Sequence, residues 1–106
     1  MILKHQIEQA TKIIVDAVHP QKIYLFGSYA NGKETEKSDI DFLVIMPDRT
    51  KKKYQLVDEI EKEIRNVLPV SKDIVVDYAD RYNKFHSIPY SFIGHIVNTG
   101  VLLYES

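Results

Sequence analysis

The chain has 106 residues, 44% of them hydrophobic, and its 15 acidic residues nearly balance 14 lysines and arginines. This length accommodates one domain, residues 1–106, and the apolar fraction is large enough for a core, which excludes a disordered chain. A formal net charge of −1 excludes the strongly basic surface of a protein that binds duplex nucleic acid stably.

Cysteine is absent, so disulfides and thiolate metal sites are excluded, and a cytoplasmic location is expected. No apolar run reaches the roughly 18 residues of a membrane-spanning helix. The N-terminal segment also lacks the long apolar stretch and the small-residue cleavage site of a secretory leader. We therefore expect no association with a membrane.

The first element expected is an amphipathic helix over residues 2–18, because apolar residues recur there at three- and four-residue spacings. These residues are Leu3, Ile7, Ala10, Ile14 and Ala17. His19 and Pro20 end the helix. Residues 22–27 are nearly all apolar and predict a central strand. Ser28 to about Gly32 predicts a short helix and turn, followed by a polar loop.

Residues 39–46 predict a second buried strand that stops at Pro47. A helix is expected over about 53–68, with an apolar inward face: Val57, Ile60, Ile64, Val67 and Leu68. Residues 73–78 predict a third strand. Helical structure should follow from about residue 80, with a break near 87–89. Its expected buried positions are Phe85, Ile88, Phe92 and Ile96. Gly100 suits a helix cap, and residues 101–104 a short last strand.

This order of elements predicts an α+β fold, with a small mixed sheet and helices packed mainly on one face. The link between the first two strands is short enough to be hairpin-like. The two strands can therefore be antiparallel.

The most informative motif is Gly27-Ser28, then ten residues, then Asp39-Ile40-Asp41. Residues i and i+2 of a strand share a face, so Asp39 and Asp41 should project side by side. Two such charges repel each other unless a cation neutralises them, and Mg²⁺ binds carboxylates together with substrate phosphates. The Gly-Ser turn offers a closely approachable backbone, a hydroxyl and free N–H groups to phosphate. Together these features indicate nucleotidyl transfer.

A third carboxylate is expected in the third strand, where Asp73 and Asp77 lie four residues apart and share a face. Asp73 directly precedes an apolar run, as the Asp39-Asp41 pair does. Adjacent strands would bring these starts together, so Asp73 is preferred and Asp77 is the alternative. Lys33, Lys37 and the basic segment 49–53 are interpreted first as solvated charges, and phosphate contact is the second interpretation.

The segment GSYANGKETEKSDIDFLV resembles the minimal nucleotidyltransferase (MNT) domain of the DNA polymerase β-like superfamily. Gly27, Ser28, Asp39 and Asp41 match that family's Gly-Ser, ten residues, Asp-x-Asp signature. The strands IYLFGS and SDIDFLV and the ending IVNTGVLLY are also similar to the family, so the resemblance spans nearly the whole chain.

By this resemblance, Asp39, Asp41 and a third acid, matched here to Asp73, would bind two Mg²⁺ ions. Gly27 and Ser28 would hold the β- and γ-phosphates of ATP. Relatives often carry a basic residue after Gly-Ser, where this chain has Asn31. Either Lys33 replaces that contact or the triphosphate binds more weakly. The implied reaction is attack of a hydroxyl on the α-phosphate, with pyrophosphate leaving.

Larger relatives add a helical domain that shapes the acceptor site, so here a partner or a second copy is expected to supply that surface. Stand-alone MNT proteins resemble this chain and pair with HEPN-domain toxins. The MNT antitoxin (MntA type) can transfer AMP to a tyrosine of the toxin. Two alternatives stay open: an antitoxin that acts by contact alone, and a small-molecule, aminoglycoside-type nucleotidyltransferase that acts as a homodimer.

Overall fold

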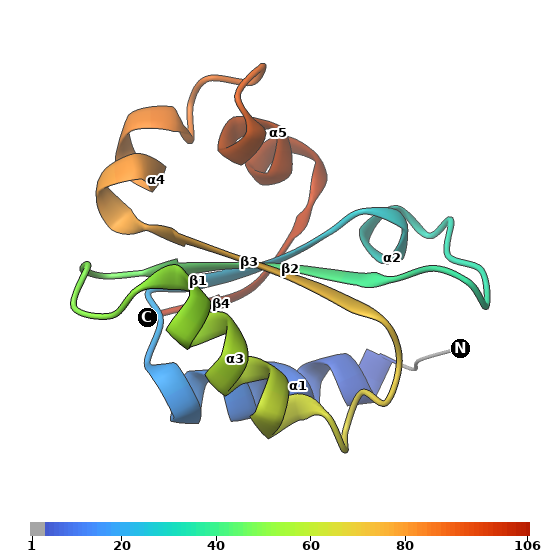
Figure 1. Ribbon diagram of the computed structural model, residues 1–106. Helices are drawn as coiled ribbons and strands as arrows, with labels where there is room; N and C mark the ends of the chain where they lie inside the picture. Colours follow the sequence, from blue (N-terminus) through green and yellow to red (C-terminus); the bar gives the residue numbers. More distant parts are fainter. Residues whose placement is uncertain (1–3) are drawn as a thin grey trace.

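The computed structural model describes residues 4–106, which form an α+β fold of five helices and four strands (Figure 1). The elements in chain order are α1 (Lys4–Val18), β1 (Lys22–Phe26), α2 (Ser28–Asn31), β2 (Ile40–Met46), α3 (Lys53–Ile64), β3 (Lys72–Tyr78), α4 (Ala79–Phe85), α5 (Phe92–Thr99) and β4 (Val101–Glu105). No helix between residues 4 and 106 is long and apolar enough to cross a membrane.

The four strands form one mixed sheet in the order β3-β2-β1-β4. Strand β1 is antiparallel to both β2 and β4, which confirms the antiparallel arrangement that the short link allowed. Strand β3 runs parallel to β2, because α3 returns the chain to the end of the sheet where β2 began. The starts of β2 and β3 therefore lie side by side.

The two longest helices, α1 and α3, cover one face of the sheet, as the sequence predicted (Figure 1). Their inward residues include Ile14, Ile60 and Ile64, which are fully buried against Phe42 and Val44 of β2. This apolar layer forms the larger of two cores.

The opposite face carries a smaller core under α4 and α5, which the prediction of helices mainly on one face did not include (Figure 1). Tyr24, Leu43 and Ile45 project to this face and are buried with Tyr82 of α4 and Ile93 of α5. Since β2 alternates, Asp41 projects to this face with Leu43. The core under α4 and α5 includes Leu43 and Ile45 but not Asp41, which lies at the start of β2.

Two sequence predictions need correction, one of a helix end and one of a buried residue. Helix α3 ends at Ile64 rather than near residue 68, although Leu68 is still fully buried after a turn closed by its N–H bond to the Ile64 carbonyl. Phe92, expected in the core, is 56% exposed. The Ser91 hydroxyl caps α5, so Phe92 is its first residue and Ile93 and Ile96 face inward instead.

The predicted break near residues 87–89 is confirmed between α4 and α5, and residues 101–104 lie within β4. The predicted helix start at residues 2 and 3, including Leu3, lies outside the described residues.

Candidate active site

The turn after β1 requires glycine at position 27. Gly27 has a φ of +76°, a conformation that residues with a Cβ rarely adopt. A Cβ placed there would also lie 2.1 Å from Oδ2 of Asp41. The missing side chain therefore lets the turn backbone pack directly on the Asp41 carboxylate, which couples the two halves of the sequence motif.

Ser28 begins the short helix α2 directly after this turn, and Gly32, with a left-handed φ of +70°, caps the end of α2. The returning chain is fixed to the turn, because the Lys33 N–H donates to the Ser28 carbonyl at 3.0 Å. The Lys33 side chain is exposed. The structure thus places both predicted phosphate-contact residues, Ser28 and Lys33, at the same turn.

Asp41 and Asp73 are direct partners in the parallel pairing of β2 with β3. Asp39 lies two residues before Asp41, at the residue that precedes β2. Burial raises the pKa of Asp41, and the negative charges of Asp73 and Asp39 raise it further. Asp39, Asp41 and Asp73 therefore form one electrostatically coupled group, which we call the acidic cluster.

Within residues 4–106, the three carboxylates of the acidic cluster make no hydrogen bond or ion pair. No group of three or more acidic or histidine side chains in this part of the chain is already arranged to hold one ion. The cluster nevertheless offers the oxygen donors that Mg²⁺ prefers, and Mg²⁺ commonly takes its other ligands from water and substrate phosphates. The residues present therefore fit Mg²⁺ bound together with a nucleotide.

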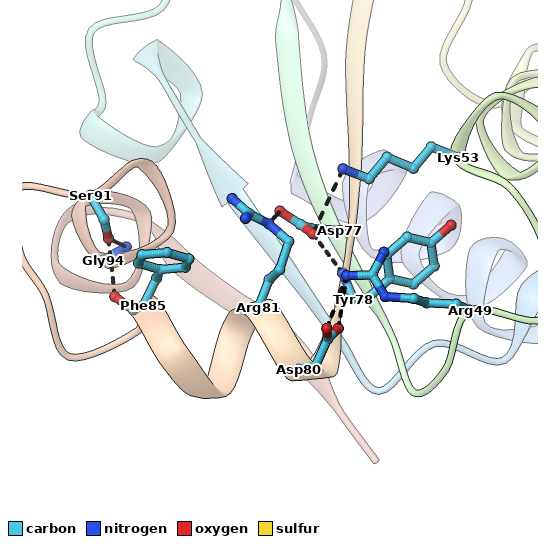
Figure 2. A network of polar contacts seen from close by, with 9 residues as sticks. All are labelled: Arg49, Lys53, Asp77, Tyr78, Asp80, Arg81, Phe85, Ser91 and Gly94. Atoms are coloured by element: carbon cyan, nitrogen blue, oxygen red, sulfur yellow. Dashed lines mark hydrogen bonds and ion pairs between the residues drawn. The ribbon is translucent and has the colours of Figure 1, made fainter.

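Asp77, the alternative third acid, lies apart from the acidic cluster. It pairs in register with Ile45, and four residues of strand separate it from Asp73 by about 13 Å. Its carboxylate is already occupied (Figure 2), since the Tyr78 N–H and the Arg81 Nε donate to it at 2.9 and 3.1 Å. Lys53 lies 3.8 Å away. The structure thus brings Asp73, and not Asp77, to Asp41.

Sequence reasoning missed the partners of the basic segment 49–53. Arg49 donates to both carboxylate oxygens of Asp80 and lies over the Tyr78 ring, and Lys53 pairs with Asp77 (Figure 2). These partners are more than 20 residues away, so no local pattern in the sequence could reveal them. Arg49 and Lys53 are therefore partnered across elements rather than simply solvated.

Comparison with known families decides the identity of the fold and its chemistry. The family model described as "nucleotidyltransferase domain" matches residues 7–98. The chain belongs to this nucleotidyltransferase family. The resemblance predicted from Gly27, Ser28, Asp39 and Asp41 is thereby confirmed, and the chain is a nucleotidyltransferase.

Two relatives of this nucleotidyltransferase are candidate protein adenylyltransferases of Methanocaldococcus jannaschii. One is 31% identical over 103 residues, which cover 92% of this chain and 97% of the relative. The other is 30% identical over 73 residues, which cover 69% of this chain and 73% of the relative.

Solved structures of toxin–antitoxin complexes share the fold. A toxin–antitoxin crystal structure with AMP-PNP superposes with a TM-score of 0.65 at 23% identity, covering 93% of this nucleotidyltransferase and 73% of that chain. A complex of a tri-AMPylated Shewanella oneidensis HEPN toxin with MNT antitoxin superposes with a TM-score of 0.60 at 20% identity. The match covers 97% of this nucleotidyltransferase and 72% of that chain. The predicted α+β class is confirmed.

Proposed function

We propose that this nucleotidyltransferase moves AMP from ATP to a protein hydroxyl, and that the acceptor is a tyrosine of a HEPN-domain toxin that it silences as an antitoxin. One observation carries the proposal: the three carboxylates of the acidic cluster, without partners of their own, gather around Asp41, whose carboxylate lies against the Gly27 turn. A site that needs added positive charge next to a phosphate-accepting turn fits a nucleoside triphosphate and its metal ions.

In this proposal the turn residues hold the leaving end of ATP. The Gly27 backbone and the Ser28 hydroxyl contact the β- and γ-phosphates, and the Lys33 ammonium supplies the positive charge that Asn31 cannot. Since Lys33 is joined to Ser28 through its backbone, its side chain starts close to the phosphates. Pyrophosphate is therefore held on the β1 side of the site.

Asp39, Asp41 and Asp73 would hold two Mg²⁺ ions, which would offset the charge that develops on the transferred phosphate. Asp73 is placed to accept the proton of the attacking hydroxyl. As that oxygen bonds to the α-phosphorus, the bond to pyrophosphate breaks on the opposite side. The chain's own contribution is then to align the two reactants and to hold the carboxylates together.

The support for a protein acceptor comes from the relatives and not from the geometry of the site. The Methanocaldococcus jannaschii relatives are candidate protein adenylyltransferases, and a fold neighbour is an MNT antitoxin in complex with an AMPylated HEPN toxin. The absence of cysteine from the sequence supports a cytoplasmic location for this chain.

Intact-mass analysis of a HEPN-domain protein from the same genome, mixed with this chain, ATP and Mg²⁺, tests the proposal. A gain of one or more AMP groups on the HEPN protein is expected, and none with the matched double variant Asp39→Asn/Asp41→Asn. A tight complex that neutralises the toxin without a mass change would favour an antitoxin that acts by contact. Transfer to free hydroxyl compounds alone would favour a small-molecule transferase.

A further inference from the structure

Arg81 is a cation held over the sheet face that carries the acidic cluster by two separate contacts. Its Nε donates to Asp77 Oδ2 at 3.1 Å, and its guanidinium lies over the Phe85 ring, 5.0 Å from the ring centre (Figure 2). Asp77 lies in β3 and Phe85 in α4. The contacts from two elements restrict the guanidinium to one orientation.

The outer nitrogens of this guanidinium are available to a ligand. Among residues 4–106, Arg81 bonds only through Nε, and its side chain remains 48% exposed. Four N–H donors on the two Nη atoms are thus left without a protein partner. A preorganised arginine of this kind is suited to bind the acceptor atoms of a ligand, because little side-chain entropy remains to be lost.

The position of Arg81 relates it to the substrate. Asp73, Val75 and Asp77 alternate along β3 and share one face. Arg81 is bound to Asp77 and therefore lies further along β3 than the acidic cluster, with Val75 between them. Val75 is only half-buried and belongs to the apolar group that includes Phe85. In the proposed function, pyrophosphate lies toward Gly27 on β1 and the acceptor hydroxyl opposite it, toward Asp73 on β3. The nucleoside leaves the α-phosphorus across this line, so it can extend along the strands in the direction of Arg81.

We propose that Arg81 binds the nucleobase of the nucleoside triphosphate through its Nη groups, and that Asp77 is the positioning residue that holds Arg81 in place. This inference rests on the proposed function, because it uses the direction in which the triphosphate lies. It also gives Asp77 a role that differs from metal binding. Asp77 is only 7% exposed, and burying such a carboxylate is costly unless it is paired.

The test is the affinity of the whole chain for ATP and for inorganic tripolyphosphate, each with Mg²⁺, by titration calorimetry. Arg81→Gln is expected to weaken ATP binding by about ten- to a hundredfold, the effect of losing a charged hydrogen bond. Tripolyphosphate binding should stay unchanged, since it lacks a nucleoside. Asp77→Asn should weaken ATP binding less, with the same selectivity, and Arg81→Lys should restore part of the loss.

Arg49→Gln is the matched control, because Arg49 also pairs with an aspartate and lies on an aromatic ring, but it contacts Asp80 and Tyr78 instead. Its ATP affinity should equal that of the wild type. Equal ATP binding by Arg81→Gln and the wild type would overturn this inference and leave the proposed function standing. Parallel losses for ATP and tripolyphosphate would place Arg81 on the phosphates and overturn it as well. A wild-type chain that binds no ATP would instead overturn the proposed function.

Discussion

Asp41 of β2 and Asp73 of β3 are directly paired across two parallel strands. This pairing concentrates negative charge where both strands begin, and Asp39 adds to it. Like charges at such positions destabilise a protein that has no cation to neutralise them. The geometry that suits nucleotidyl transfer should therefore reduce the stability of the free protein, as is common at active sites.

The first prediction concerns Asp41 and pH. Because its pKa is raised above the ordinary 3.8 in the folded protein, the folded state binds the proton more tightly than the unfolded state does. This contribution to stability is present at low pH and is lost as pH rises from the ordinary value through the raised one. Asp41→Asn should therefore be more stable than the wild type at pH 7 without metal, with a smaller difference near pH 4.

Urea unfolding in EDTA at both pH values measures this difference. Asp16→Asn is the control, since Asp16 is exposed on α1 and belongs to the other side of the sheet. An Asp41→Asn variant that is less stable than the wild type at pH 7 would contradict the electrostatic account of the cluster.

The second prediction is that Mg²⁺ stabilises the wild type through the acidic cluster. At a metal concentration about 100 times the dissociation constant, the gain in unfolding free energy should be about 2.7 kcal/mol. Thermal melts with Mg²⁺ and with EDTA should show an increase in Tm for the wild type and for Asp16→Asn. The same increase in the Asp39→Asn/Asp41→Asn variant would place the metal elsewhere.

The third prediction separates two glycines with similar backbone strain. Gly27 and Gly32 have φ values of +76° and +70°, but an added Cβ meets Asp41 at Gly27 and nothing within 4 Å at Gly32. Both Gly→Ala variants should lose about 1–2 kcal/mol of stability from positive φ. Only Gly27→Ala should lose transfer activity as well, because it displaces the Asp41 carboxylate. Activity lost equally in both variants would show that strain, and not the contact with Asp41, matters.

Much of this site could be predicted because its signal is local. Gly27, Ser28, Asp39 and Asp41 lie within 15 residues, and alternation along a strand is enough to place the two aspartates on one face. The choice of Asp73 over Asp77 required the register of two strands. The sequence indicated this register, because Asp73 and the Asp39-Asp41 pair each directly precede an apolar run. The pairing of Asp41 with Asp73 agrees with that argument.

Other features could not be read from the sequence because they depend on contacts between distant elements. Phe92 was predicted to be buried because it follows Ile88 at helical spacing, but this spacing crosses the break, and the Ser91 cap starts a new helix with a different phase. The Lys53–Asp77 pair joins α3 to β3, and Arg81 could be related to the acidic cluster only when β3 and α4 had been placed.

The fourth prediction compares the two acids of β3. Asp73→Asn should lower kcat by about 10²–10⁴-fold if Asp73 accepts the acceptor's proton. Asp77→Asn should keep kcat and raise KM for ATP, since it acts through Arg81. Steady-state kinetics with the HEPN-domain acceptor measures both. The reverse pattern would assign the third carboxylate to Asp77.

The central claim is that the acidic cluster and the Gly27-Ser28 turn transfer a nucleotidyl group to a protein. The most direct measurement mixes the chain, Mg²⁺ and the HEPN-domain protein with ATP labelled at either the α- or the γ-phosphate. We expect the α-label on the HEPN protein, the γ-label in released pyrophosphate, and neither reaction with Asp39→Asn/Asp41→Asn. A γ-label on the acceptor, or no label on it from either ATP, would contradict the claim.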